Sequence, residues 1–193
     1  MDSSNGYEKV ARAFVNVRGN ATNRIGVPEV KSWAASFPAG ATVLDLGCGS
    51  GMPISKTLID QKLTVYGIDA SPTLVAQFRK HFPHHEIRCE SVEASSFYGL
   101  IFDGIVAWGL VFLLPPETQV ALLAKIARHL KPGGKLLFTS PSQPVEWVDV
   151  MTGRPSASLG RETYRDVLAQ HGIRVVGEFA DEGENHYYSC EKA

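Results

Sequence analysis

Residues 43–51 read VLDLGCGSG, and this stretch decides the fold. The apolar run at residues 42–46 is typical of a buried strand, and apolar residues with helical spacing follow at residues 54–61. Three glycines, at positions 47, 49 and 51, lie between the two. Glycine lacks the Cβ atom that would keep a ligand away from the backbone, and a helix N-terminus presents free N–H groups. The stretch therefore predicts a strand, a ligand-binding loop and a helix in succession.

The same loop argues against two phosphate-binding motifs. In the dinucleotide motif G-x-G-x-x-G the third glycine would stand where this sequence has Met52, and no Gly-Lys-Ser/Thr follows for a P-loop. Asp69 ends the next apolar run, residues 63–68, at the place where a carboxylate accepts hydrogen bonds from ribose hydroxyls. Asp69 as a helix-capping or turn residue is the alternative, but Ser71 already supplies a cap. These features favour a nucleoside-containing ligand.

Short apolar runs alternate with helical stretches after residue 40, which is typical of an α/β fold with a largely parallel sheet. Strands are expected at residues 42–46, 63–68, 85–89, 102–107, 135–139, 173–178 and 186–190, and helices at 54–61, 72–82, 116–130 and 161–170. Two amphipathic helices, at residues 7–17 and 28–37, are expected to cap the sheet. Residues 141–160 read as a loop that binds substrate.

Composition narrows the function class. The chain has 193 residues, a formal net charge of −1 and a hydrophobic fraction of 44%, as in an ordinary single domain, and it lacks the surplus of Lys and Arg that nucleic acids or anionic membranes require. The N-terminus does not resemble a signal peptide, and the longest nearly apolar run, residues 104–114, is shorter than the roughly 20 residues of a membrane span. Cys48, Cys89 and Cys190 form no paired motif, so we expect a cytoplasmic protein with reduced thiols and no metal site.

Four ordered segments, VLDLGCGSG, VYGIDAS, FDGIVAWG and LKPGGKLLF, resemble the motifs of class I S-adenosylmethionine-dependent methyltransferases over residues 40 to 140. The resemblance implies a Rossmann-like domain whose mostly parallel seven-stranded sheet has an antiparallel last strand and helices on both faces. It also implies S-adenosyl-L-methionine as cofactor and S-adenosyl-L-homocysteine as product. Residues 1–193 would form one domain, with an N-terminal helical cap (1–40), a cofactor-binding core (41–140) and a substrate-side loop, helix and last strands (141–193).

The resemblance also implies where the cofactor would lie. The methionine part would contact the loop, the ribose would contact the end of the second strand, the adenine would contact the segment CESVEA, and the sulfonium would lie beside the end of the fourth strand. The usual Asp is absent from the adenine segment, and Glu90 offers a competing alignment to Ser91 and Val92. Trp108 as a core residue is the alternative to a cofactor contact. The expected cofactor residues are Asp45, Gly47, Cys48, Gly49, Asp69, Ala70, Ser91, Val92, Trp108 and Gly109.

The sequence gives fewer signals for residues that bind the acceptor or take part in catalysis than for residues that bind the cofactor. Some small-molecule members of the family have a His beyond the fourth strand, but this sequence reads GLVFLL there, with Phe112 at the aromatic position. The segment DEGENHYY at residues 181–188 is either a polar β-hairpin or a source of catalytic groups, with His186, Glu184 and Asn185 as the candidates. Tyr7, Phe112 and Trp147 are the expected substrate-binding residues, with Phe14 and Arg18 further along the first helix, Arg18 toward the methionine carboxylate.

These features predict an enzyme that transfers a methyl group to a small-molecule acceptor by in-line displacement. A non-catalytic S-adenosylmethionine-binding module is one alternative, because no base is evident, and a protein or nucleic-acid methyltransferase is another. The nucleic-acid reading is disfavoured because LPPE at residues 114–117 comes too late and lacks the aromatic residue of the amino-methyltransferase motif. A nicotinamide-dependent oxidoreductase would rest only on the loop and Asp69. The sequence fits a monomer or a dimer equally.

Overall fold

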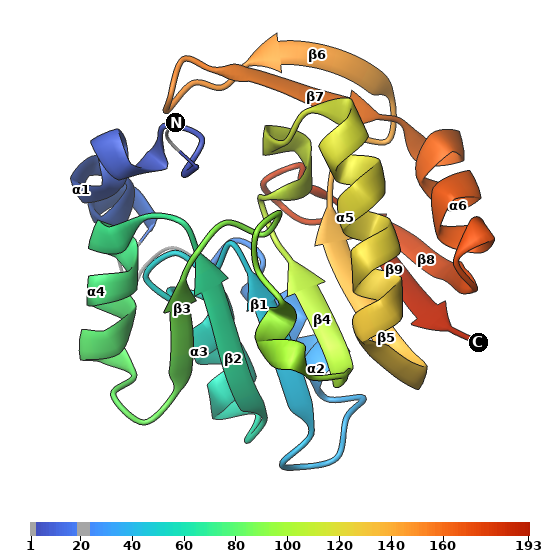
Figure 1. The fold of residues 1–193 in the computed structure, drawn as a ribbon, viewed down its shortest axis with the longest axis horizontal. Coiled ribbons are helices and arrows are strands. Elements are labelled where there is room, and N and C mark those ends of the chain that lie inside the picture. Colours follow the sequence, from blue (N-terminus) through green and yellow to red (C-terminus); the bar gives the residue numbers. More distant parts are fainter. Residues whose placement is uncertain (1–2, 19–23) are drawn as a thin grey trace.

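The computed structural model describes residues 3–18 and 24–193, which form a seven-stranded sheet between two layers of helices (Figure 1). The strand pairs β3–β2, β2–β1, β1–β4 and β4–β5 are parallel, and β9 runs antiparallel to both β5 and β8. The predicted mostly parallel sheet with an antiparallel last strand is therefore confirmed. In spatial order the strands are β3 (Glu86–Cys89), β2 (Thr64–Asp69), β1 (Thr42–Leu46), β4 (Phe102–Ala107), β5 (Leu130–Thr139), β9 (His186–Lys192) and β8 (Ile173–Ala180).

Alternation of side chains along the strands divides the core into two layers. Val43 and Val65 face α2 (Val27–Ala34) and α3 (Ile54–Asp60), and Gly67 faces α4 (Pro72–His81). Leu44 and Ile68 face the opposite layer, which contains α5 (Pro116–His129), α6 (Arg161–Gln170) and the short helices η1 (Phe97–Gly99) and η2 (Val111–Leu113). Both faces of the parallel strands are thus covered, as apolar runs such as that of β1 predict.

Local sequence signals explain several helix boundaries. The Ser71 hydroxyl accepts the N–H of Leu74 at 3.2 Å, which makes Ser71 the N-cap of α4, as its place before Pro72 predicts. The helix α5 ends at His129 and β5 begins at once, whereas the sequence predicts a strand only from Lys135. The reason is a pairing of Leu130 with Phe102 before an irregularity in the ladder, which extends the strand through the Pro-Gly-Gly turn.

The segment predicted as a loop at residues 141–160 contains a β-hairpin. Strands β6 (Pro144–Val148) and β7 (Pro155–Leu159) pair with each other and not with the main sheet. In the turn between them, the Asp149 N–H donates to the Arg154 carbonyl, and the Gly153 N–H donates to the Asp149 carbonyl. Most of β6 is exposed, so the segment lacks the alternation of buried residues by which a strand is predicted from sequence.

The two N-terminal helices take different places. The helix α2 covers the sheet beside α3, whereas α1 (Tyr7–Arg18) packs on α4 near the carboxyl ends of the parallel strands (Figure 1). The Glu8 carboxylate fixes α1 there, because it accepts the N–H of Thr73 at 3.1 Å and the hydroxyl groups of Thr73 and Ser71 at the N-terminus of α4. In the described part of the chain, no helix has the length and apolar character needed to cross a bilayer.

Candidate functional site

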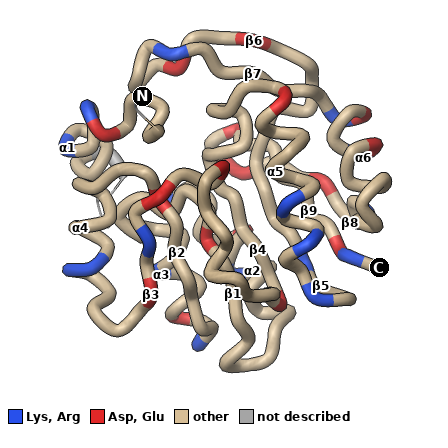
Figure 2. Tube along the Cα trace, viewed as in Figure 1, with Lys and Arg blue, Asp and Glu red and all other residues tan. Residues whose placement is uncertain are grey.

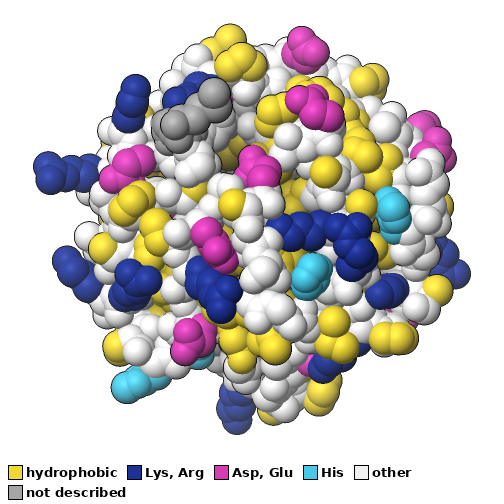
Figure 3. Space-filling model, viewed as in Figure 1, with side chains coloured by type: hydrophobic (Ala, Val, Ile, Leu, Met, Phe, Trp, Pro, Cys, Tyr) yellow, Lys and Arg dark blue, Asp and Glu magenta, His cyan; other side chains and the backbone are white. Residues whose placement is uncertain are grey.

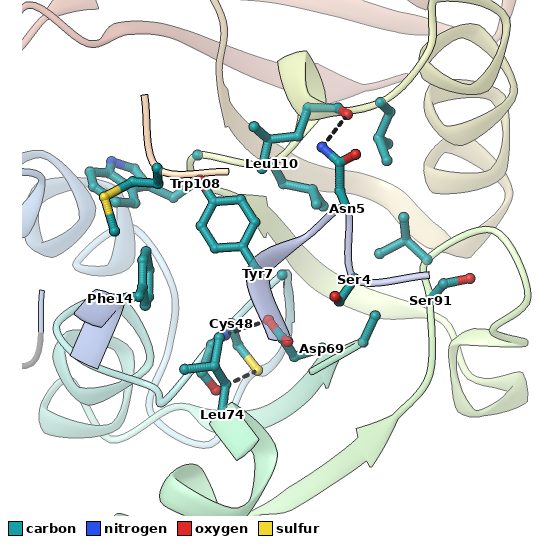
Figure 4. Close-up of a pocket in the computed structure, with 18 of the residues that line it drawn as sticks. Ser4, Asn5, Tyr7, Phe14, Cys48, Asp69, Leu74, Ser91, Trp108 and Leu110 are labelled. Atoms are coloured by element: carbon teal, nitrogen blue, oxygen red, sulfur yellow. Dashed lines mark hydrogen bonds between the residues drawn. The ribbon is translucent and has the colours of Figure 1, made fainter. Parts of the chain in front are cut away.

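A cavity of about 430 Å³ opens at the carboxyl ends of β1, β2 and β4, under α1 and the tip of the β6–β7 hairpin (Figure 4). The carboxyl edge of a parallel α/β sheet is where such folds bind ligands, and the volume is that of a small-molecule site. Every cofactor residue expected from the sequence lines this cavity: Asp45, Gly47, Cys48, Gly49, Asp69, Ala70, Ser91, Val92, Trp108 and Gly109.

The glycine loop bends by positive φ angles at Gly47, Gly49 and Gly51, and its N–H groups are already used. Gly47 and Cys48 donate to the Ile68 carbonyl at 2.8 and 3.1 Å, and Gly51 donates to the Cys48 carbonyl. These three loop N–H groups are therefore not free to face a ligand, because the end of β2 accepts two of them and the loop itself accepts the third. A phosphate would find few donors here, and the loop offers a close, neutral backbone surface instead.

Asp69 lies at the junction of β2 and the glycine loop (Figure 4). Its Oδ2 accepts the N–H of Gly49 and its Oδ1 accepts the N–H of Ser71, both at 2.8 Å. Burial raises the pKa of the Asp69 carboxyl, while these two bonds lower it. Each oxygen keeps one lone pair, so the carboxylate is oriented by the protein and still accepts hydrogen bonds from a ligand.

Asp45 lies under the loop and is only 1% exposed. The Ser55 hydroxyl, on α3, donates to Asp45 Oδ2 at 2.5 Å. Desolvation is the largest cause that raises the pKa of Asp45 to about 7, and the charge of Asp69 adds to it. A buried acid with this pKa releases its proton readily when a cationic group of a ligand comes near.

The end of β3 contributes both alternatives for the adenine contact. Glu90, Ser91 and Val92 all line the cavity, so both alignments place their residues at its wall. The Ser91 hydroxyl accepts the N–H of Ala94 at 3.3 Å, and Glu90 Oε1 accepts the Ser95 hydroxyl at 2.7 Å. These bonds hold the turn after β3 in place, with polar atoms at the wall of the cavity.

Trp108 and Gly109, after β4, form the wall opposite the glycine loop (Figure 4). The Trp108 indole donates to the Tyr187 hydroxyl at 2.6 Å, and that hydroxyl donates to Asp181 Oδ2 at 2.8 Å. The Gly109 N–H donates to the Thr139 hydroxyl at 2.8 Å, and the space that a Cβ would take at Gly109 is open. The indole therefore belongs to the cavity and is oriented by a polar network behind it.

The expected substrate-binding residues divide into two groups. Tyr7 and Phe14, on α1, line the cavity with their rings edge to face at 5.4 Å, and Phe112 lines it from η2 (Figure 4). Trp147, on β6, does not line the cavity but packs its ring on Phe112, with centroids 5.4 Å apart. The side chain of Arg18 lies outside the described residues. Aromatic rings thus form one apolar part of the wall, and Trp147 supports it from behind.

The three candidate catalytic residues are separated by the structure. Asn185 lines the cavity, and its side-chain amide donates to both Asp181 oxygens at 3.0 Å. His186 lies outside the cavity lining, with its Nε2 at 2.8 Å from Glu178 Oε2, and Glu184 is exposed in the turn before β9. Arg161 and Arg165 also bind Glu178, so that carboxylate and His186 form an ion-pair cluster on α6 and β8.

Two further contributions to the cavity come from residues that are not among the expected cofactor-binding or substrate-binding residues. Ser3, Ser4 and Asn5 line it, and the Asn5 amide donates to the Leu113 carbonyl at 2.8 Å (Figure 4). Asp149, at the hairpin turn, is 8% exposed and also lines the cavity. A polar N-terminus is typical of an exposed tail. The sequence signal for Asp149 is its place in a loop after the fifth strand that is rich in polar and aromatic residues.

The cavity carries acidic groups without basic ones. Asp45, Asp69, Glu90, Glu93 and Asp149 line it, and among the described lining residues none is Lys, Arg or His. Acidic residues cluster near the carboxyl ends of the parallel strands, whereas most Lys and Arg lie on outer helices and strand ends (Figure 2). In the space-filling view from the same side, hydrophobic and acidic side chains lie together in the upper part of the molecule (Figure 3). Over residues 3–18 and 24–193, no group of three or more His, Cys, Asp and Glu side chains could hold a metal ion.

Comparisons with known proteins agree with this geometry. Residues 43–134 match the family described as "Methyltransferase domain". The ubiquinone biosynthesis O-methyltransferase of Xanthomonas axonopodis pv. citri (strain 306) is 30% identical over 156 residues, 78% of this chain and 56% of that protein. The cypemycin N-terminal methyltransferase of a Streptomyces species is 36% identical over 121 residues, 60% of this chain and 49% of that protein. The chain thus spans about half the length of these curated relatives.

Solved structures share the fold. A SAM-bound amino pentose methyltransferase from Micromonospora echinaspora, involved in calicheamicin biosynthesis, superposes with a TM-score of 0.73 at 17% sequence identity. The match covers 94% of this chain and 97% of that one. At this identity the likeness concerns the fold, and it extends over both helical layers and the antiparallel last strand.

Proposed function

This chain belongs to the class I S-adenosylmethionine-dependent methyltransferase family, and on that premise we propose that it transfers a methyl group from S-adenosyl-L-methionine to a small-molecule acceptor. When bound, the cofactor supplies an electrophilic methyl group on a positively charged sulfur. The residues of this chain bind the cofactor, orient it and exclude water from the reacting atoms.

The charge of the cavity is the observation that carries the proposal. Its acidic lining, without a described basic residue, fits a ligand that brings positive charge. The occupied N–H groups of Gly47, Cys48 and Gly51 leave little for a pyrophosphate, which disfavours a nicotinamide dinucleotide. The fixed carboxylate of Asp69 supports a contact with ribose hydroxyls, and the buried carboxyl of Asp45 under the loop supports a contact with the amino group of the methionine part.

The proposal for the acceptor rests on the relatives. The curated relatives named above act in ubiquinone biosynthesis or on the N-terminus of cypemycin, and the solved neighbour is described as acting on an amino pentose. We carry over from them a small or peptide-sized acceptor, in agreement with the formal net charge of −1. The described cysteines are all free thiols, which supports a reducing, cytoplasmic setting.

Calorimetric titration with S-adenosylhomocysteine and, separately, with NADH tests the proposal. We expect S-adenosylhomocysteine alone to bind, at about one site per chain. Gly49→Arg should abolish binding, because a side chain at Gly49 would meet Phe14 across the cavity. Asp69→Asn should weaken it by roughly tenfold or more by removing the charge that accepts ribose hydroxyls. Asp60→Asn, an exposed carboxylate paired with Lys56, is the control and should bind normally.

Two results would contradict the proposal. Binding of NADH without S-adenosylhomocysteine would favour an oxidoreductase. Binding of S-adenosylhomocysteine with no methyl transfer to any of a broad panel of amines, alcohols and thiols would favour a non-catalytic binding module.

A further inference from the structure

We infer that the methyl acceptor is an amine with an apolar body and no anionic group, and that Asp149 is the carboxylate that contacts its amino group. This inference rests on the proposed function and deepens it. It starts from the one acidic side chain of the cavity that belongs to the hairpin rather than to the ends of the parallel strands.

Asp149 is built into the hairpin turn and is not a mobile surface acid. Its Oδ1 accepts the N–H groups of Met151 and Thr152 at 3.1 and 2.7 Å, and the Thr152 hydroxyl at 2.8 Å. Within the described part of the chain no hydrogen bond reaches Oδ2. The residue is 8% exposed and lines the cavity, so a carboxylate with one free oxygen is held at the wall. An N–H donor of a ligand would satisfy that oxygen.

The other acids of the described lining come from the ends of the parallel strands. Asp45 and Asp69 end β1 and β2, and Glu90 and Glu93 follow β3. Asp149 comes from the opposite rim, where Arg154 is the nearest basic residue of the hairpin. Arg154 does not line the cavity, and its Nε would lie 3.0 Å from a Cβ at Gly6. No described cation of the lining therefore compensates Asp149, and a carboxylate or phosphate on the acceptor would be repelled there.

Apolar side chains line the same cavity as Asp149. Tyr7, Phe112, Leu113 and Met151 line the same cavity. Trp147 supports Phe112 from outside, at 5.4 Å between ring centroids. An apolar body would be buried by these side chains, and the carboxylate would select the polar end of the molecule. A carboxylate combined with apolar side chains is the pattern of a site for amines.

Amine methylation is chemically balanced without a further reagent. The amine nitrogen, in its free-base form, donates its lone pair to the methyl carbon as the carbon–sulfur bond breaks, and that electron pair stays on sulfur. The nitrogen becomes a methylated ammonium, so the positive charge passes from sulfur to the product. An acceptor that arrives as an ammonium ion first loses one proton to solvent. Asp149 positions the nitrogen through an N–H···O bond and favours the cationic product.

The test uses the protein saturated with S-adenosylhomocysteine, titrated calorimetrically with three matched probes: 2-phenylethylamine, 2-phenylethanol and phenylacetate. We expect the amine to bind at least about tenfold more tightly than the alcohol, and phenylacetate to bind most weakly. In Asp149→Asn, which keeps an oxygen for the turn, the preference for the amine over the alcohol should fall to about threefold or less. The affinity for S-adenosylhomocysteine should not change in this variant.

Glu146→Gln is the matched control, because Glu146 is an exposed acid on β6 of the same hairpin and does not line the cavity. It should keep the full preference for the amine. The inference is overturned if phenylacetate binds as well as the amine, if no probe binds, or if Asp149→Asn retains the preference, while S-adenosylhomocysteine still binds. Failure of S-adenosylhomocysteine itself to bind would instead overturn the proposed function, and the inference with it.

Discussion

The indole Nε1 of Trp108 donates a 2.6 Å hydrogen bond to the hydroxyl of Tyr187, 79 residues further along the chain. The same hydroxyl donates to Asp181, which also binds Asn185. Trp108 and Asn185 both line the cavity, whereas Tyr187 and Asp181 lie behind them. The last strand and the turn before it therefore help to build the wall of the cavity.

Tyr187→Phe should lower the free energy of unfolding by about 1–3 kcal/mol, because the indole N–H loses its acceptor in a buried setting. It should also weaken S-adenosylhomocysteine binding, since Trp108 would no longer be held at the wall. Urea denaturation and calorimetry measure the two effects. Tyr188→Phe is the control, because the Tyr188 hydroxyl makes only a 3.4 Å contact with the Pro141 carbonyl. Equal losses in both variants would contradict the role given to Tyr187.

Glu8→Gln should loosen α1 without unfolding the domain. The change removes the negative charge that Glu8 places at the N-terminus of α4, where it binds Ser71 and Thr73, an effect of roughly 0.5–2 kcal/mol. Amide hydrogen exchange of α1 should accelerate, and S-adenosylhomocysteine should bind more weakly because Tyr7 and Phe14 line the cavity from this helix. Glu117→Gln, an acid in the first turn of α5, should leave both properties unchanged. Unchanged exchange in α1 would refute the anchoring role of Glu8.

The part of the cavity lining that comes from strand ends could be predicted because its residues are local to those ends. A parallel sheet brings all its carboxyl ends to one edge, so a residue placed just after a strand is also placed in space. Asp69 is predictable in this way from the run of apolar residues before it, whereas Trp108 is implied by the resemblance to the methyltransferase family, and both line the cavity. Contacts between distant segments carry no such signal. Asn5 reaches the Leu113 carbonyl 108 residues away, and nothing in the N-terminal sequence predicts it.

The position of His186 follows from the alternation of side chains between the two faces of a strand. His186 and Tyr188 lie on one face of β9, where Tyr188 joins the core beneath α5 and α6, and Tyr187 lies on the other face, with α2. His186 therefore points toward Glu178 rather than into the cavity. The polar content of the segment suggests catalysis, but the alternation along the strand determines which layer of the core each side chain joins. For residues 186–188, this alternation predicts that His186 and Tyr187 lie on opposite faces of the strand.

Gly51→Ala should destabilise the protein more than glycine replacement at an open position. A Cβ at Gly51 would lie 2.5 Å from Phe82 and 2.8 Å from Phe78, and the φ of 80° is already unfavourable for alanine. We expect a loss of roughly 2–4 kcal/mol in the free energy of unfolding. Gly153→Ala is the matched control, with a φ of 68° and nothing within 4 Å of its Cβ, and should lose about 1 kcal/mol. Thermal unfolding measures the loss in both variants. Equal losses would show that the rings of Phe78 and Phe82 move aside without a cost in free energy.

The pKa of Asp45 predicts the pH dependence of stability in the protein without ligand. Because burial raises this pKa from 3.8 to about 7, the folded state keeps a proton on Asp45 between about pH 4 and pH 7 that the unfolded chain has released. The stabilisation from this proton is complete below pH 4 and is lost as pH rises through 7. Asp45→Asn cannot titrate at this site and still accepts the Ser55 hydroxyl. The free energy of unfolding of the wild type should therefore fall, relative to this variant, from pH 5 to pH 8.

Urea denaturation at pH 5, 6, 7 and 8 measures this difference directly. The pKa of Asp69 is also raised, so the wild type and Asp45→Asn share its contribution, and subtraction of the two curves isolates Asp45 and its coupling to Asp69. Asp60→Asn, which changes an exposed carboxylate on the same helix as Ser55, should run parallel to the wild type across the range. Parallel curves for Asp45→Asn and the wild type would mean that Asp45 is ionised in the folded state throughout, with a counter-charge or water supplied under the glycine loop.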